Sequence, residues 1–206
     1  MMEDGIIAGN VFDKYGTRNP IAKYLMRGFL RTVDELVSLA GVTDIHEVGC
    51  GEGHLSVFLA RENRAVRASD PSHYVIEKAR GVGCRAGVHI SFKVANIYEL
   101  TSREDAAALV VCCEVLEHVP DPHHALRLLS LLAKPYLLVS VPREPIWRIL
   151  NCARGKYLTQ FGNTPGHLQH WSRRAFLGLL VQYVDIVQVR SPLPWTVALC
   201  HVRHNG

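Results

Sequence analysis

The sequence predicts an α/β fold: a doubly wound, mostly parallel sheet with helices on both faces. Segments with strand and helix character alternate along most of the 206 residues, as in successive β-α-β units. Several strand segments are apolar almost throughout, which is typical of strands covered on both sides. A short turn containing proline joins the last two strand segments. That turn is too short for a helical crossover, so we expect these two strands to pair antiparallel.

Six elements are expected in the first half of the chain. The first helix has apolar residues at helical spacing, among them Leu25, Phe29 and Val33, and Gly41 is a suitable stop. In order, we expect a helix over Ala22–Ala40, a strand over Ile45–Cys50, a helix beginning near Gly53, a strand over Ala65–Ser69, a helix over Ser72–Arg80 and a strand over Ile90–Ala95.

The second half continues the alternation, with one interruption. We expect a strand over Leu109–Cys113, a helix over His123–Ala133, a strand over Tyr136–Val141, a helix over Arg173–Gln182 capped by Ser172, and strands over Val184–Arg190 and Thr196–Val202. Residues Pro142–Trp171 break the rhythm. Long excursions in compact domains are usually functional, and this one leaves from the carboxyl end of a strand, where ligands bind in open parallel sheets.

Composition excludes several classes of protein. With 48% hydrophobic and 20% charged residues, a chain of this length can bury a full core and is not disordered. The net charge of +4 comes from scattered basic residues, which does not favour nucleic-acid binding. The apolar runs are too short to cross a bilayer, and no signal segment is evident, so we expect a cytoplasmic protein without a membrane span. The six cysteines are expected to be reduced thiols.

The strongest local signal is the segment Glu47–Gly53, E-V-G-C-G-E-G, between a predicted strand and a predicted helix. Glycines there permit a sharp turn and close approach of a ligand. The spacing is G-x-G-x-G, and His54 stands where the dinucleotide fingerprint G-x-G-x-x-G needs glycine, which disfavours a nicotinamide cofactor. Asp70, at the end of the next strand, is placed to accept hydrogen bonds from ribose hydroxyls. A tight turn without a ligand is the simpler alternative.

This segment, Asp70 and the run Cys112–Pro122, C-C-E-V-L-E-H-V-P-D-P, resemble the class I S-adenosylmethionine-dependent methyltransferases. The similarity is greatest to the small-molecule branch that includes the quinone-biosynthesis methyltransferases. It extends roughly from Asp44 to Val202 and implies a Rossmann-like sheet of seven strands with an antiparallel last strand. It also implies a single domain over residues 1–206, with a lid segment and helix over 1–41 and an insertion over 142–171 that forms part of the acceptor site.

The resemblance implies S-adenosylmethionine as cofactor and S-adenosylhomocysteine as product. By position, the glycine segment would line the methionine part, Asp70 would hold the ribose, and the residues after the next strands would contact the adenine and the sulfonium. Asn96 stands where many relatives carry aspartate. The implied cofactor-binding residues are Glu47, Gly49, Cys50, Gly51, Gly53, Asp70, Pro71, Ser72, Asn96, Ile97, Cys113 and Glu114.

Candidate catalytic residues fall in three places: Tyr15 in the N-terminal segment, Glu114 and His118 after the fourth strand, and His167 and His170 in the insertion. Methyl transfer is an in-line displacement, and an oxygen or carbon nucleophile must also lose a proton, typically to histidine or a carboxylate. His167 and His170 have the spacing of a metal-binding pair, but no third ligand at a suitable spacing is evident, so we expect no metal site.

We therefore expect an enzyme that moves a methyl group from S-adenosylmethionine to an O, N or C nucleophile of a small molecule, as a monomer or homodimer. An RNA or protein methyltransferase is one alternative, although the N-P-P-[YF] signature of base methylation is replaced here by C-E-V-L-E-H. A non-catalytic module that binds S-adenosylmethionine is the other. No nucleic-acid partner is expected.

Overall fold

The computed structural model describes residues 2–3, 6–7, 19–61 and 63–203. Tyr15 and most of the expected lid segment lie outside these residues, so both stay predictions. Near the N-terminus, β1 (Met2–Glu3) and β2 (Ile6–Ile7) pair antiparallel. Among the described residues, no helix is long and apolar enough to cross a membrane.

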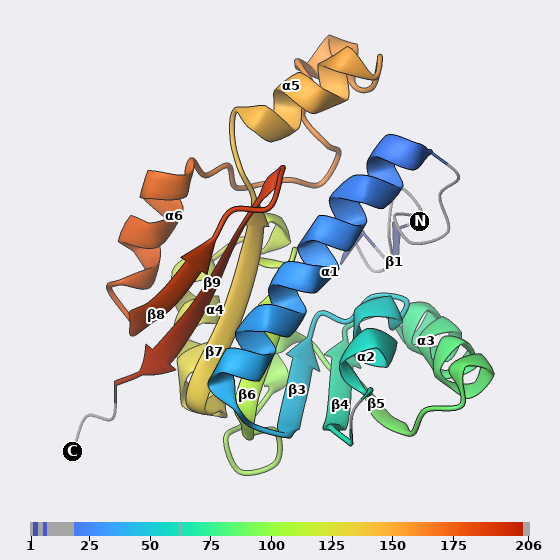
Figure 1. Ribbon diagram of the computed structural model, residues 1–206, viewed down its shortest axis with the longest axis vertical. Helices are drawn as coiled ribbons and strands as arrows, with labels where there is room; N and C mark the ends of the chain where they lie inside the picture. The colour runs from blue at the N-terminus through green and yellow to red at the C-terminus, as the bar shows by residue number, and fades with distance from the viewer. Residues whose placement is uncertain (1, 4–5, 8–18, 62, 204–206) are drawn as a thin grey trace.

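One sheet of seven strands organises the chain (Figure 1). Its strands are β3 (Asp44–Val48), β4 (Ala65–Asp70), β5 (Ile90–Val94), β6 (Ala107–Cys113), β7 (Ala133–Pro142), β8 (Val184–Arg190) and β9 (Trp195–Val202). They lie in the order β5-β4-β3-β6-β7-β9-β8. Strands β3 to β7 pair in parallel, and β9 lies between β7 and β8 and is antiparallel to both. The predicted mostly parallel sheet with an antiparallel last strand is confirmed.

Helices cover both faces of this sheet. They are α1 (Pro20–Ala40), α2 (His54–Leu59), α3 (His73–Ala86), α4 (Pro122–Leu132), α5 (Ile146–Ala153) and α6 (Arg173–Leu180), with short 3-10 helices η1 (Ile97–Glu99), η2 (Leu116–His118) and η3 (Leu158–Gln160). Side chains of α1 and α2 form one core cluster with the sheet, and those of α4 and α6 form another. In Figure 1, α5 projects beyond the carboxyl ends of the strands.

The position of strand β6 between two layers of helices explains why its sequence is apolar throughout. Leu109 and Val111 point into the core cluster beneath α1, whereas Val110 and Cys112 point into the cluster beneath α4. All four are fully buried. Because successive side chains of a strand face opposite sides, a strand covered by helices on both sides needs apolar residues at every position.

Two predicted boundaries are wrong by about three residues or more. Helix α3 does not end at Arg80 but continues to Ala86, where Gly87 caps it with a φ of +67°. Gly83 lies inside the helix beside the ring of Phe92, where an added Cβ would make an ordinary contact at 3.5 Å. Strand β7 begins at Ala133, directly after α4, because that residue already pairs with Ala107 of β6.

Candidate active site

A cavity of about 870 Å³ lies beyond the carboxyl ends of β3, β4 and β6. Its floor is the glycine segment after β3, together with Asp70, Asn96 and Glu114, which follow or end successive strands. The first turns of α1 and much of the 142–171 segment line the rest. The predicted location of the site at this edge agrees with the geometry of open parallel sheets, whose loops converge there.

Two glycines shape the floor. Gly49 has a φ of +79°, its amide donates to the Ser69 carbonyl at 2.8 Å, and an added Cβ would lie 2.2 Å from Cγ2 of Val115. Gly51 has a φ of +53°, and no atom lies within 4 Å of where its Cβ would stand. Gly49 is therefore required by packing, and Gly51 leaves bare backbone open towards the cavity.

The structure uses Gly53 and Ser72 for packing and capping, and neither lines the cavity. A Cβ on Gly53 would lie 2.9 Å from Cβ of Ala79, so this glycine lets α2 approach α3. The Ser72 hydroxyl caps α3 by accepting a hydrogen bond from the Val75 amide. Their contact with the cofactor therefore stays a prediction, whereas neighbouring Pro71 does line the cavity.

The Asp70 carboxylate is held by backbone amides on both sides. Its Oδ2 accepts a hydrogen bond from the Gly51 amide at 3.0 Å, and its Oδ1 accepts one from the Ser72 amide at 3.1 Å. These bonds fix the carboxylate at the end of β4, facing the cavity. The predicted ribose-binding position is thus occupied by a rigidly oriented acceptor.

Glu47 is a buried acid beneath the glycine segment, with 3% of its surface exposed. The Ser56 hydroxyl donates a hydrogen bond to its Oε2. Burial raises the pKa of Glu47 to about 8, and the nearby Asp70 charge acts in the same direction. A cationic ligand group would favour the charged form of this carboxyl, as the resemblance implies for the cofactor's amino group.

The remaining floor residues are Asn96, Ile97, Cys50 and Cys113, and all of them line the cavity. The Asn96 side chain caps η1 by accepting from the Tyr98 amide at 3.1 Å. Burial raises the pKa of both cysteine thiols above the ordinary range. Neither thiol is therefore suited to act as a nucleophile.

Glu114 is held in an unusual backbone conformation, with a φ of +60°. Its amide donates to the Ser140 carbonyl at 3.1 Å, and the Ser140 hydroxyl donates to Oε1 at 3.3 Å. The indole Nε1 of Trp195 donates to Oε2 at 2.7 Å. Two neighbouring strands thus orient one carboxylate towards the cavity. Sequence reasoning placed residue 195 in a turn and missed this partner, because no local pattern links two residues 81 positions apart.

Aromatic side chains form one wall of the cavity. Trp147 of α5 stacks on His167 with ring centroids 5.9 Å apart, and its Nε1 donates to the Thr164 hydroxyl at 2.9 Å. Trp195 lies 6.0 Å from Trp147 and 5.0 Å from Phe29 of α1, centroid to centroid. The sequence did not predict α5, the helix inside the 142–171 segment.

The segment around His167 is hydrogen-bonded to η2. The Glu117 carbonyl accepts hydrogen bonds from the Leu168 and Gln169 amides at 2.8 and 3.1 Å. His118 Nδ1 lies 2.9 Å from the Gly166 carbonyl oxygen. As a result the rings of His118 and His167 meet edge to face, with centroids 4.9 Å apart, and both line the cavity.

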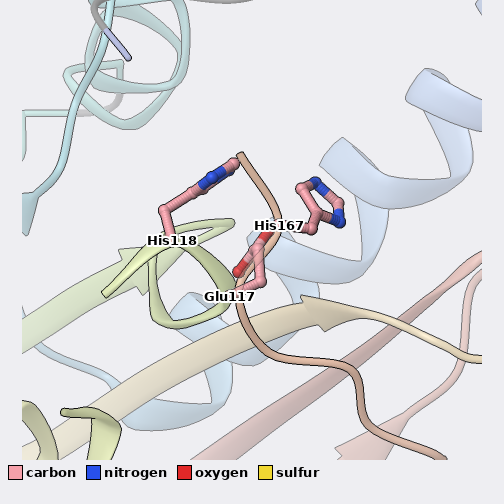
Figure 2. A group of neighbouring side chains, drawn as sticks. All are labelled: Glu117, His118 and His167. Carbon is pink, nitrogen blue, oxygen red and sulfur yellow. The ribbon is translucent and has the colours of Figure 1, made fainter. Parts of the chain in front are cut away.

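His170 is directed elsewhere. Its Nε2 lies 2.7 Å from Oδ1 of Asn163, and it does not line the cavity. The His170 ring lies 6.5 Å from the His167 ring, centroid to centroid, so His118 is the nearer of the two histidines to His167. Figure 2 shows His118, His167 and Glu117 pointing towards one another, with one ligand atom from each within 4.8 Å of the others. The sequence search for a third ligand missed this group because its members come from two distant segments.

Comparison with known proteins decides the family. Residues 22–183 match the family described as "Methyltransferase domain". The chain belongs to this methyltransferase family. A ubiquinone biosynthesis O-methyltransferase of Xylella fastidiosa is 30% identical over 184 residues, which cover 82% of this chain and 73% of that protein. The prediction of an S-adenosylmethionine-dependent methyltransferase is confirmed.

Solved structures confirm the fold of this methyltransferase. Magnesium protoporphyrin IX methyltransferase from Synechocystis PCC 6803, with bound SAH, has a TM-score of 0.70 at 19% identity and covers 91% of this chain and 90% of its own. The N-methyltransferase NodS from Bradyrhizobium japonicum, in complex with S-adenosylhomocysteine, has a TM-score of 0.66 at 18% identity, and 94% of each chain is covered.

The residues present fit S-adenosylmethionine, the cofactor of this methyltransferase. The bare backbone at Gly51, the oriented carboxylate of Asp70 and the buried acid Glu47 face one cavity. Gly51 offers a backbone surface without a side chain, Asp70 offers a hydrogen-bond acceptor, and Glu47 offers an acid that can pair with a cation. This is the donor set that a sulfonium amino acid joined to a nucleoside requires.

Proposed function

We propose that this methyltransferase methylates a hydroxyl group of a small, flat molecule. The observation that carries the proposal is that one cavity joins the glycine segment and Asp70 to a wall of aromatic and imidazole rings. A cavity of about 870 Å³ is in the usual range for a binding site of small molecules. The relatives named ubiquinone biosynthesis O-methyltransferases support the same acceptor chemistry.

Bound S-adenosylmethionine supplies an electrophilic methyl group on a sulfonium. Asp70 would hold the ribose, Gly51 would line the methionine part, Glu47 would pair with the amino group, and Asn96 and Ile97 would contact the adenine. Glu114, which accepts hydrogen bonds from Trp195 and Ser140, would lie beside the sulfonium. The protein thus contributes alignment of oxygen, methyl carbon and sulfur, which is largely a proximity effect.

His118 and His167 activate the acceptor. Both rings line the cavity next to Trp147, so a hydroxyl on a ring bound against this wall comes within their reach. A hydroxyl must lose its proton in order to attack the methyl group. Activation of this kind typically contributes about 10²–10⁴-fold to the rate.

The 142–171 segment forms the acceptor side of the site. Trp147 and Leu150 give it an apolar face, and Arg154 and Lys156 line the same cavity. An aromatic ring that also carries an anionic group, such as a carboxylate, complements this combination of apolar and basic residues.

We place the enzyme in the cytoplasm, because all six cysteines are free thiols, as expected in a reducing compartment.

The test begins with cofactor binding. S-adenosylhomocysteine at about 100 times its Kd should stabilise the folded chain by about 2.7 kcal/mol, whereas NAD should leave the melting temperature unchanged. Labelled S-adenosylmethionine is then offered with hydroxybenzoates, catechols and aromatic amines. Transfer to phenolic oxygen, lowered in His118→Ala and His167→Ala with little change in cofactor affinity, is the expected result. Transfer to amines alone would contradict the proposed acceptor, and a folded chain that binds no S-adenosylhomocysteine would contradict the use of this cofactor.

A further inference from the structure

We propose that the Thr164 hydroxyl donates a hydrogen bond to the reacting oxygen of the acceptor and stabilises the oxyanion that attacks the methyl group. The inference rests on the proposed hydroxyl methylation and adds a catalytic residue to it. Thr164 lines the cavity, and its carbonyl accepts a hydrogen bond from the His167 amide at 3.1 Å. The hydroxyl therefore lies in the wall where the proposed acceptor binds, beside one of the two imidazoles proposed to take the acceptor's proton.

Two neighbouring side chains donate hydrogen bonds to the Thr164 hydroxyl oxygen. Trp147 Nε1 lies 2.9 Å from Oγ1, and Asn151 Nδ2 lies 3.2 Å from it. An indole N–H can only donate. The orientation of the Asn151 amide is fixed by two further bonds, from Nδ2 to the Gly162 carbonyl at 2.8 Å and from Arg154 Nη2 to Oδ1. Both bonds to Thr164 Oγ1 are therefore accepted by that oxygen.

The hydrogen of the Thr164 hydroxyl is the group that remains for a ligand. A threonine hydroxyl has one hydrogen and two lone pairs, so two accepted bonds leave only the hydrogen. Among the described residues, no side chain or carbonyl accepts a hydrogen bond from it. Because Thr164 lines the cavity, its hydroxyl presents a donor to the acceptor molecule and no free lone pair.

A position that only donates favours an oxygen nucleophile over a nitrogen nucleophile. A neutral amine has one lone pair, and a hydrogen bond to it occupies the electrons that must attack the methyl carbon. An oxyanion has further lone pairs, so it can accept a hydrogen bond and still attack. Hydrogen bonds to charged groups are stronger than those to neutral groups. The Thr164 hydroxyl therefore binds the oxyanion more tightly than the neutral hydroxyl from which it forms.

The step conserves protons and electrons. The acceptor hydroxyl passes its proton to the imidazole of His118 or His167, and the resulting oxyanion accepts the hydrogen bond from Thr164. The oxygen then forms a bond to the methyl carbon while the bond from that carbon to sulfur breaks. The products are a methyl ether and a thioether, and the imidazolium returns its proton to water. Thr164 keeps its hydrogen throughout, as the donors of an oxyanion hole do.

The test measures the ionisation of a bound phenol without turnover. The probe is 4-nitrophenol, whose anion absorbs visible light, bound to the full chain saturated with S-adenosylhomocysteine. Thr164→Val keeps the shape of the side chain and should raise the pKa of the bound phenol by about one to two units above the wild-type value. Thr164→Ser keeps the hydroxyl and should retain the wild-type value. Thr159→Val is the matched control, because Thr159 is an exposed residue of η3 that does not line the cavity.

A second probe separates donation from support of the wall, because Thr164→Val also removes the oxygen to which Trp147 and Asn151 donate. The methyl ether 4-nitroanisole forms no oxyanion, so its affinity should change little in Thr164→Val. Equal loss of affinity for 4-nitroanisole and for the 4-nitrophenol anion would show that Thr164 only supports the wall and would overturn the proposal. An unchanged pKa of the bound phenol in Thr164→Val would overturn it as well, and so would the absence of 4-nitrophenol binding by the wild type.

Turnover separates this proposal from the proposed function. Methylation of phenols should fall by about 10–100-fold in Thr164→Val, in kcat more than in KM, and recover in Thr164→Ser. Methylation as fast in Thr164→Val as in the wild type would overturn the role of Thr164 and leave the proposed function intact. A pKa of the bound phenol that depends on Thr164, in a chain that methylates no phenol, would instead count against the proposed function. S-adenosylhomocysteine is titrated into every variant as a measure of folding, and Thr164→Ala replaces a Thr164→Val variant that does not bind it.

Discussion

At the scale of single residues, Asp70 connects the glycine segment to the proposed ribose position. Its two carboxylate oxygens are held by the Gly51 and Ser72 amides, so the orientation that a ribose would meet exists before binding. Preorganisation of this kind lowers the entropic cost of binding. The same carboxylate also holds the loop in shape, so its removal affects affinity through both effects.

We predict that Asp70→Ala weakens binding of S-adenosylhomocysteine by about 10–100-fold, because hydrogen bonds to a charged group contribute about 1.5–3 kcal/mol. Isothermal titration of the folded variant measures this change. Asp185→Ala is the control, since that carboxylate lies in β8 and pairs with Arg203 away from the cavity. Unchanged affinity in a folded Asp70→Ala variant would exclude the ribose-binding role.

At the scale of elements, a few hydrogen bonds from polar side chains hold the 142–171 segment in its shape. Asn151 of α5 is 1% exposed, and its Nδ2 donates to the Gly162 carbonyl at 2.8 Å. Arg148 Nε donates to the Phe161 carbonyl at 3.0 Å. These bonds fold the segment back on α5, which places His167 beside His118.

Gly162 provides the test of this arrangement. Its φ is +76°, and an added Cβ would lie 2.2 Å from the Arg148 carbonyl oxygen. Gly155 has a φ of +68°, but nothing lies within 4 Å of its Cβ position. Both alanine variants carry the backbone penalty of about 1–2 kcal/mol, whereas only Gly162→Ala forces the segment off α5.

We therefore predict faster tryptic cleavage after Arg154 and Lys156 in Gly162→Ala than in Gly155→Ala. Affinity for S-adenosylhomocysteine should change little in either variant, because the glycine segment and Asp70 lie on the sheet side of the cavity. Mass spectrometry of timed digests measures the difference. Equal cleavage rates in the two variants would show that the contact at Gly162 does not hold the segment in place.

At the scale of the whole molecule, a buried acid links stability to pH. The pKa of Glu47 is raised from 4.5 to about 8 in the folded chain. Between these values the folded chain keeps a proton that the unfolded chain has released. The free energy of unfolding must therefore fall as the pH rises through this window. His46, whose pKa is lowered by burial, acts in the opposite direction, because protonation below its ordinary pKa favours the unfolded chain.

We predict that the ligand-free wild type loses on the order of 3 kcal/mol more stability between pH 5 and pH 8 than Glu47→Gln does. Glutamine keeps the shape of the side chain and cannot ionise, while His46 is present in both proteins and its contribution cancels. Urea denaturation at several pH values measures the two profiles. Parallel profiles would show that Glu47 is not protonated in the folded chain.

The sequence by itself determined the features that depend on residues close to one another in the chain. Burial on both faces requires uninterrupted apolar strands, and Leu109–Cys113 was recognised in this way. A turn at positive φ favours glycine, as at Gly49 and Gly51, and Asp70 follows from its position at the end of the next strand. The methyltransferase family and its cofactor follow from these motifs, because each is contained in a short stretch of chain.

Only the tertiary structure decided which distant side chains meet. Gly53 and Ser72 belong to the same motifs, yet helix packing and capping use them outside the cavity. The sheet order brings Trp195 to Glu114, and the folded 142–171 segment brings His167 to His118. Such contacts leave no periodic trace in the sequence, because they depend on the order of strands and on how an irregular segment returns to the sheet.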